Sequence, residues 1–553
     1  MARVTTWPAV RVVFVENHDS FSWNVIELLP LPRRDVRVVS ADRALPALDG
    51  ADALVIGPGP MDPLRAGLVE LVGAAAARRL PTLGVCLGHQ ALGLAFGARL
   101  GRTTPAHGKP AVVHLGASRL FEGLEGPLWA MRYHSLSLFD VVPPLKVVAS
   151  LEDGTVMAVE HESLPMAGLQ FHPDSWGTPR GRELVERFFE RASAAGPRDA
   201  PSAPGKPSER AEPRAQGHTS FVPVLLSTLR DLDDFALLSP GYSGRRGWTL
   251  LSGLAAGGRD LVVCEAESRA PRWYGGVRRS VSLEVDVAPA QLEPKLQEEG
   301  FREAVAEIRE AVARGDVYQV NLTRRALLGE VDAAALLATV CRRGVPRFAA
   351  WVKAKGLGEF VTASPELLVE VVGGERRVRV EPMKGTAAAG QSAWLEASAK
   401  DAAELGMITD LLRDDLQPLC VPGSVTVVDP RRLVSLPYAV QTVSVIEGRL
   451  ADGVTMDDVL ARVHPGGSVT GAPREAALAV IGRLESTPRR FYCGALGLKS
   501  DDGLRTALLI RTAWREPSGW RWGVGGGITW DSVAESELEE LRVKLGALRP
   551  FGT

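Results

Sequence analysis

One segment of the sequence lacks every large apolar side chain. Residues 194–217 read AAGPRDAPSAPGKPSERAEPRAQG, with no Val, Ile, Leu, Met, Phe, Trp or Tyr and with five prolines. Such a segment has too little apolar surface to offset the entropy lost on folding, so we predict a flexible linker, placed at residues 194–218. Because the linker cannot join a core, the 553 residues must form two units with separate cores, residues 1–193 and 219–553.

Composition and charge exclude several classes of protein. Hydrophobic residues make up 45% and charged residues 24%, as in globular chains. The formal net charge of −2 gives no basic surface for nucleic acid or an anionic membrane. Apolar runs such as Phe221–Leu229 are too short to span a bilayer, and the N-terminus carries no secretory pattern. The five cysteines form no CxxC pair. We therefore expect a cytoplasmic protein with no nucleic-acid or membrane partner.

The first unit has the pattern of an α/β domain with an open, mostly parallel sheet. Short apolar runs bounded by turn residues predict buried strands, and helical stretches lie between them. The predicted strands are Val10–Val15, Val36–Val39, Ala53–Ile56 and Thr82–Val85, and the helices include Ser22–Leu29 and Leu64–Arg79. Because ligands collect at the carboxyl ends of such strands, three loops are candidates for a site: Glu16–Phe21, Gly57–Pro60 and Cys86–Gln90.

The second unit mixes strand and helix patterns without the regular alternation of parallel-sheet folds, which predicts an α+β layered domain. Predicted helices are Phe301–Arg314 and Val533–Leu545, and predicted strands are Val425–Val428, Ala439–Glu447 and Ala507–Thr512.

Cys86 is the first candidate nucleophile. Gly84 and Gly88 flank it at two residues on either side, which permits a tight strand-to-helix turn. The dipole of the following helix would favour the thiolate. The alternative is a buried structural cysteine. His172 and Asp174, which follow a later apolar run, could supply a general base and a carboxylate that orients it.

With GVCLGHQ around Cys86, YHSL at 133–136 and the opening ENHDSF, the first unit resembles class I glutamine amidotransferases of the kind paired with chorismate enzymes. The resemblance implies Cys86 as nucleophile on the glutamine amide and His172 as base and acid. Asp174 stands where the family normally has Glu. The implied oxyanion hole is formed by the backbone N–H groups of Gly59 and Leu87, and the implied glutamine binders are Gln90, His134 and Ser135.

Paired carboxylates recur in the second unit. Asp401 and Glu404 share one helix face by their spacing of three, as do Glu537 and Glu540, with Lys544 one turn beyond. Each pair alone is typical of a solvated helix with ion pairs, but two such faces could meet around Mg²⁺. Gly525–Gly527 is either a turn or a backbone approach to an anion. Lys384 alone would be a surface lysine.

Four motifs in order, PMKGT at 382–386, GGSVTGAP at 466–473, IRT at 510–512 and GGGITWDSVAESELEE, resemble the chorismate-utilising enzymes: anthranilate, aminodeoxychorismate, isochorismate and salicylate synthases. The resemblance implies Mg²⁺ held by Glu404 and Glu540, with Glu537 and Asp401 supporting. The implied binders of the substrate carboxylates are Arg511, Tyr492, Lys544, Thr470 and the amides of Gly526 and Gly527.

Two positions favour the aminodeoxychorismate branch of this family. Lys384 stands where anthranilate synthases usually carry Ala, and Gln441 where they usually carry His. The branch implies attack by Lys384 on C2 of chorismate, with Glu366 protonating the leaving 4-hydroxyl. The implied partners are chorismate, L-glutamine, docking of the two units and a separate downstream lyase. Two alternatives stay open: anthranilate synthase or another aminating enzyme, and a first unit that is structural or regulatory.

Overall fold

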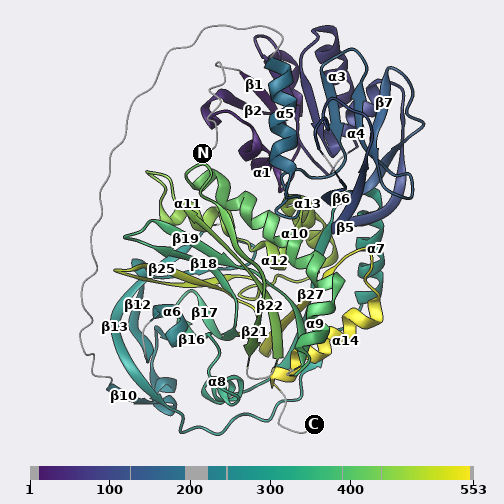
Figure 1. The fold of residues 1–553 in the computed structure, drawn as a ribbon. Coiled ribbons are helices and arrows are strands. Elements are labelled where there is room, and N and C mark those ends of the chain that lie inside the picture. Colours follow the sequence, from purple (N-terminus) through teal and green to yellow (C-terminus); the bar gives the residue numbers. More distant parts are fainter. Residues whose placement is uncertain are drawn as a thin grey trace.

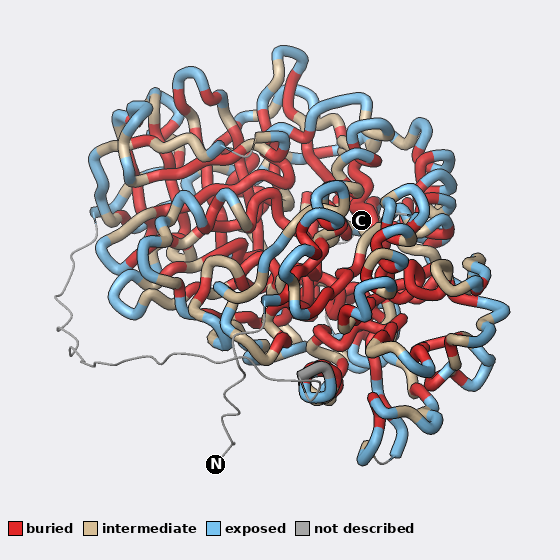
Figure 2. The backbone as a smooth tube through the Cα atoms, turned by 90° about the horizontal axis from the view of Figure 1, so that it is seen from above, coloured by how far each residue is buried: buried red, intermediate tan, exposed pale blue. Residues whose placement is uncertain are grey.

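The structure is a computed structural model that describes residues 11–60, 62–124, 126–193, 222–244, 247–268, 270–388, 390–436 and 439–548. The predicted linker, 194–218, lies outside the described residues. Figure 1 shows two domains, one formed by the early residues and one by the later residues, with the long helix α10 (Ala399–Leu416) lying where they meet. Buried backbone runs through the interior of both domains (Figure 2).

The first domain is a sheet covered by helices. Its elements are β1 (Val12–Glu16), α1 (Ser22–Leu28), β2 (Val36–Ser40), α2 (Ala41–Ala47), β3 (Ala53–Ile56), α3 (Leu68–Ala77), β4 (Thr82–Val85), α4 (Leu87–Ala95), β5 (Arg99–Leu115), β6 (Leu128–Phe139), β7 (Leu145–Ser150), β8 (Val156–His161), β9 (Met166–Leu169) and α5 (Gly181–Ser193).

The strand order in this sheet is β2-β1-β3-β4-β9-β8-β7-β5-β6. Strands β2, β1, β3, β4 and β9 run parallel, and the rest are antiparallel, so the sheet is mixed. β3 and β4 coincide with the predicted strands and are buried throughout, because a strand covered on both faces needs apolar residues at successive positions. The loops after β1, β3 and β4 therefore meet at one sheet edge, as predicted.

The second domain is built on a large, mainly antiparallel sheet with helices packed on it. Its strands are β10 (Val222–Leu225), β11 (Phe235–Leu238), β12 (Trp248–Cys264), β13 (Arg272–Glu284), β14 (Lys295–Leu296), β15 (Gln319–Gly329), β16 (Phe348–Ala354), β17 (Gly358–Ser364), β18 (Leu367–Val372), β19 (Arg377–Glu381), β20 (Met383–Ala388), β21 (Thr426–Leu436), β22 (Ala439–Arg449), β23 (Gly471–Ala472), β24 (Ala495–Ser500), β25 (Gly503–Leu508), β26 (Thr512–Glu516) and β27 (Gly519–Ile528). Besides α10, its helices are α6 (Pro240–Ser243), α7 (Phe301–Arg314), α8 (Ala333–Cys341), α9 (Ser392–Ala397), α11 (Met456–Val463), α12 (Gly467–Thr470), α13 (Arg474–Leu484) and α14 (Ala534–Lys544).

One sequence prediction in this domain needs correction, and one open alternative is excluded. The stretch 507–512 is not one strand: β25 ends at Leu508 and β26 begins at Thr512, because Arg511 adopts a positive φ of 53° that no strand accommodates. Gly525–Gly527 form no turn but lie inside β27, with Asn321 of β15 opposite Gly527. Helix α7 coincides with its prediction.

In the described part of the chain, we find no helix with both the length and the apolar character needed to cross a membrane.

The two domains meet along α10 through buried polar contacts. The carboxylate of Asp410 accepts hydrogen bonds from the Tyr133 hydroxyl at 2.9 Å, from the Trp176 backbone N–H at 3.0 Å and from the Ser175 hydroxyl. One turn further along, Asp414 Oδ1 accepts from the backbone N–H groups that open α1, at Trp23 and Asn24. Both carboxylates are buried, with 1% and 2% of the residue exposed. Water therefore cannot easily replace these hydrogen bonds if they are lost.

Asp410→Ala should weaken this boundary strongly. The substitution leaves the buried donors of Tyr133, Ser175 and Trp176 without an acceptor, and we expect the free energy of unfolding to fall by about 3–5 kcal/mol. The matched control is Asp531→Ala, which removes an exposed ion pair to Lys109 across the same boundary and should cost below about 1 kcal/mol. Denaturant unfolding checks both; equal effects would contradict the expectation.

Candidate active sites in the two domains

Cys86 lies at the sharp turn between β4 and α4, with φ 51° and ψ −97°. The turn is possible because two glycines let backbone segments approach closely. A Cβ on Gly84 would lie 2.4 Å from the carbonyl of Gly88, and a Cβ on Gly88 would lie 2.3 Å from the carbonyl oxygen of Ile56. The strained cysteine is therefore held by its surroundings, as is common at functional positions.

His172 and Asp174 are buried beside the cysteine. His172 Nδ1 lies 3.2 Å from Asp174 Oδ1, so the shorter aspartate still reaches the imidazole. Burial alone would lower the pKa of His172, but the Asp174 carboxylate and the Cys86 thiol outweigh it and raise that pKa well above its usual range. A charged imidazole next to a cysteine is the arrangement found at activated cysteine nucleophiles.

Gly59, Leu87 and Gln90 are also predicted for this site. Gly59 lies against Leu87, since a Cβ on Gly59 would be 2.8 Å from Leu87 Cδ2, so the two proposed oxyanion donors come from loops in contact. Gln90 donates to Gln170 Oε1 at 3.2 Å, and Gln170 Nε2 donates to Cys86 Sγ at 3.6 Å. Gln170 was missed by the sequence analysis, although it stands two residues before His172.

His134 and Ser135 lie on β6 near the domain boundary. His134 Nδ1 is 2.9 Å from the Leu136 carbonyl, and burial holds its pKa well below the usual range, so it is neutral. The Ser135 hydroxyl donates to the carbonyl of Val312 in α7 of the second domain. Ser135 is thus engaged across the boundary, and its predicted role with glutamine stays a prediction.

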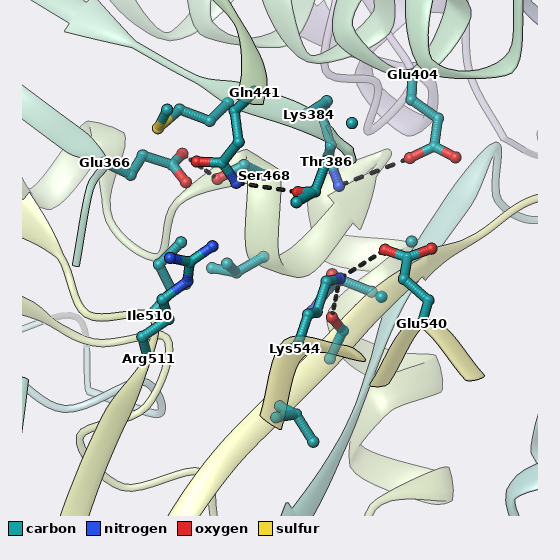
Figure 3. Close-up of a pocket in the computed structure, with 18 of the residues that line it drawn as sticks. Glu366, Lys384, Thr386, Glu404, Gln441, Ser468, Ile510, Arg511, Glu540 and Lys544 are labelled. Atoms are coloured by element: carbon teal, nitrogen blue, oxygen red, sulfur yellow. Dashed lines mark hydrogen bonds and ion pairs between the residues drawn. The ribbon is translucent and has the colours of Figure 1, made fainter. Parts of the chain in front are cut away.

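A second pocket lies in the other domain, between β20, β22, β27, α10 and α14 (Figure 3). Most of the residues predicted for this domain line it: Glu366, Lys384, Glu404, Tyr492, Arg511, Gly526, Gly527, Glu540 and Lys544. Lys384 Nζ lies 4.0 Å from Glu404 Oε2. The lysine that alone could have been a surface residue instead lines this pocket, with 10% of its side chain exposed.

Glu366 and Glu404 are carboxyls in an unusual state. Burial raises the pKa of Glu366 to about 7, even though the Ser468 hydroxyl, at 2.7 Å, and Lys384 both lower it. Burial likewise raises the pKa of Glu404 to about 7, against Lys384 and Lys400 and with help from Glu540 and Glu537. A carboxyl with a pKa near neutrality can exist as an acid at physiological pH, as general acid catalysis requires.

The carboxylates of Glu404 and Glu540 face the same space in Figure 3. Glu537 is held by Lys400 at 2.7 Å through Oε1, whereas Glu537 Oε2 has no hydrogen-bond partner in the described structure. Within the described residues, no group of three or more His, Cys, Asp and Glu side chains is arranged to hold a metal ion by itself. Mg²⁺ is commonly bound by one or two carboxylates together with substrate oxygens and water. The carboxylates of Glu404 and Glu540 therefore fit the predicted ion, with substrate and water as its remaining ligands.

Cationic and neutral donors face the carboxylates across the pocket. Burial lowers the pKa of Arg511 to about 10, so its guanidinium stays charged. Burial raises the pKa of Tyr492 well above its usual range, so its hydroxyl is neutral. Lys544 pairs with Glu540 at 2.7 Å and donates to the carbonyl of Gly525. A dianionic substrate matches this set.

Glycines of β27 make room for the pocket. A Cβ on Gly527 would lie 2.0 Å from Gln319 Nε2 and 3.0 Å from Glu404 Oε2, and one on Gly523 would lie 2.1 Å from the Tyr492 ring. Gln319 Nε2 in turn donates to Glu404 Oε2 at 3.1 Å. Gln319 and Ser468 were missed as site residues. Ser468 lies inside the GGSVTGAP motif, whereas Gln319 has no local signal.

Gln441 lines the pocket, whereas Thr470 does not. The Thr470 hydroxyl donates to the Gly466 carbonyl at 3.0 Å, and Thr470 is not among the residues that line the pocket. Its contact with substrate stays a prediction. Gln441 lines the pocket and donates through Nε2 to Thr386 Oγ1 at 3.0 Å.

Two family models match the chain. Residues 263–550 match the model for a chorismate binding enzyme, and residues 13–192 match the model for glutamine amidotransferase class-I. The predicted fold of each domain is thereby confirmed.

Curated relatives match both domains. An aminodeoxychorismate synthase of Streptomyces griseus is 29% identical over 98% of this chain and 95% of that protein. Anthranilate synthase component 2 of Thermus thermophilus is 40% identical over 33% of this chain and 92% of that protein. Anthranilate synthase component 1 of Spirochaeta aurantia is 35% identical over 52% of this chain and 60% of that protein.

Gly527→Ala should disrupt the second pocket. The added methyl group must displace Gln319 or Glu404, both buried, so we expect a loss of at least about tenfold in the second domain's activity, with a destabilisation of about 1–3 kcal/mol from overpacking. The control is Gly482→Ala in α13, where a Cβ meets nothing within 4 Å. Steady-state kinetics with ammonium as the nitrogen source tests both variants, and an unaffected Gly527→Ala would contradict the expectation.

Proposed function

The chain belongs to the chorismate binding enzyme family, and we propose that it moves ammonia from L-glutamine in the first domain to C4 of chorismate in the second. The product would be 4-amino-4-deoxychorismate, which a separate lyase would convert to 4-aminobenzoate. The observation that carries this proposal is the Lys384 amine, which enters the pocket beside Glu404. The relatives named aminodeoxychorismate synthase support it, since they match 98% of the chain.

In the first domain, the Cys86 sulfur attacks the carboxamide carbon of glutamine. The negative charge that develops on the carbonyl oxygen is received by the N–H groups of Gly59 and Leu87. His172 gives its proton to the leaving nitrogen, so that ammonia departs and a thioester remains. Water then attacks the thioester, His172 takes a proton from that water, and glutamate leaves. Asp174 keeps the imidazole oriented through the contact at 3.2 Å.

In the second domain, the amine of Lys384 attacks C2 of chorismate. As the N–C2 bond forms, the C4–O bond breaks, and Glu366 gives its proton to the departing hydroxyl, which leaves as water. Ammonia then attacks C4, and the bond between C2 and the lysine nitrogen breaks. Arg511 and Tyr492 line the pocket where they can bind substrate carboxylates, which fixes the ring relative to Lys384.

Mg²⁺ is proposed as the cofactor, with Glu404 and Glu540 as its protein ligands and Glu537 and Asp401 supporting them. The ion would supply positive charge that neutralises a substrate carboxylate. The raised pKa of Glu404, which reflects burial together with the repulsion from Glu540 and Glu537, supports this assignment because a cation would relieve both.

Direct transfer of ammonia fits the domain boundary. A small cavity there is lined by residues of both domains, with His107 and Lys109 on one side and Ala403, Glu404 and Met407 on the other. Glu404 also lines the second pocket. Burial lowers the pKa of His107 to about 3, so its ring is neutral. A neutral imidazole does not protonate ammonia to ammonium. This cavity is the proposed route of neutral ammonia toward Lys384.

The product of the purified chain with chorismate, glutamine and Mg²⁺ tests the proposal. We expect a 4-amino product that keeps its enolpyruvyl group, seen by mass spectrometry. A fluorescent product that has lost pyruvate would establish anthranilate synthase instead. Lys384→Ala should abolish the 4-amino product, because it removes the proposed nucleophile. Cys86→Ala, as the matched control, should lose the glutamine-driven reaction and keep the ammonium-driven one; if glutamine already adds nothing in the unchanged chain, the first domain is structural or regulatory.

The pH dependence tests Glu366 as the acid. Only protonated Glu366 can donate, and its pKa of about 7 means that the donor form is lost as the pH rises through neutrality. At a constant concentration of neutral ammonia, kcat/KM for chorismate should fall by up to about tenfold per pH unit above that pKa. Ser468→Ala removes a hydrogen bond that lowers this pKa, so its falling limb should lie at higher pH. If Ser468→Ala leaves the falling limb of the pH profile unchanged, Glu366 is not the general acid.

A further inference from the structure

A tyrosine of the second domain reaches the cysteine site of the first. Tyr318 follows α7 and directly precedes β15, and only 2% of it is exposed. Its backbone N–H donates to the Ala472 carbonyl at 2.6 Å, which anchors it in the second domain. Its hydroxyl crosses the boundary and donates to Asp19 Oδ2 at 2.7 Å.

The ring of Tyr318 is part of an aromatic group that includes His172. It stacks on Phe21 with centroids 5.9 Å apart and planes at 11°, and on His107 with centroids 5.0 Å apart and planes at 21°. Phe21 meets the imidazole of His172 edge-on at 5.4 Å. A single side chain, that of Phe21, therefore connects Tyr318 to the proposed catalytic histidine.

Asp19 is held from both sides. Its Oδ1 accepts the Phe21 backbone N–H at 2.9 Å, and its Oδ2 accepts the Tyr318 hydroxyl. Of the charges that act on this carboxylate, that of His172 has the largest influence. An ionised Asp19 therefore adds to Asp174 in stabilising the imidazolium of His172.

We propose that Tyr318 is a positioning residue of the cysteine site: its hydroxyl holds the Asp19 carboxylate in place near His172. This inference rests on the glutaminase half of the proposed function and on no assumption about the product formed in the second domain.

The charges around Asp19 set the sign of the pH effect. Burial raises the pKa of Asp19 to about 6, His172 and the Tyr318 hydroxyl lower it, and Asp174 and Glu16 raise it. His107 packs on Tyr318 and is neutral, and Cys86 acts on Tyr318 as well as on His172. Loss of the hydroxyl should raise the pKa of Asp19, so the carboxylate would ionise only at higher pH.

Tyr318→Phe tests the proposal, because it removes the hydroxyl and keeps the ring. We expect kcat for glutamate release to fall by about tenfold, as for loss of a hydrogen bond to a charged group, with KM for glutamine unchanged. The acidic limb of the pH profile should move to higher pH. The ratio of glutamine-driven to ammonium-driven amination should fall by the same factor. Tyr242→Phe, a buried tyrosine of the second domain that packs on Phe348, is the matched control and should leave glutamate release unchanged.

A double variant distinguishes the proposed route from a general loss of packing. If Tyr318 acts through Asp19, adding Tyr318→Phe to Asp19→Asn should lower kcat no further. Independent effects of the two changes, an effect on KM alone, or an unchanged kcat would each overturn the proposal. Glutamate release is measured without chorismate, so a chain that makes anthranilate instead would refute the proposed product and leave this test intact.

Discussion

The burial of carboxylates along one helix is the constraint on which the arrangement of the two domains depends. Asp410 and Asp414 of α10 are desolvated at the boundary, and hydrogen-bond donors of the first domain, backbone and side chain, satisfy them. Buried charge without partners is costly, so the helix fixes where the first domain must lie. The same helix carries Glu404 into the pocket of the second domain. One rigid element therefore positions both the boundary and a proposed ligand of the metal.

The two proposed sites use charge in opposite ways. Around Cys86 the carboxylate of Asp174 raises the pKa of His172 and keeps its proton in place. In the second pocket, burial raises the pKa values of Glu366 and Glu404 and prepares those carboxyls to hold a proton or a cation. In both cases the low exposure of the groups makes the interactions strong.

Motifs in the sequence predicted most of the groups that line each site. Cys86 and His172 stand near strand ends, where the loop residues carry a local pattern. Helical spacing placed Glu404, Glu537 and Glu540 in carboxylate pairs, and the family resemblance supplied their proposed role. The sequence could not predict Tyr318, Asp410 or Gln319 as site residues, because their partners lie far away along the chain and no local pattern identifies a long-range contact. The break at Arg511 was also missed, since an apolar run carries no signal for a positive φ.

Helix α10 has a consequence for the exchange of domains between related enzymes. Three of the residues of α10 that contact the first domain, Asp410, Arg413 and Asp414, occupy one stripe of the helix. Along the helix axis, Asp410 lies about 9 Å from Glu404. In a hybrid joined at the segment between the domains, this stripe of α10 would stay with the second domain. A transplanted amidotransferase would then meet carboxylates selected for another partner. Compatibility in such hybrids therefore depends on this part of α10, together with other boundary contacts such as that of Ser135 with Val312, and not on the connecting peptide alone.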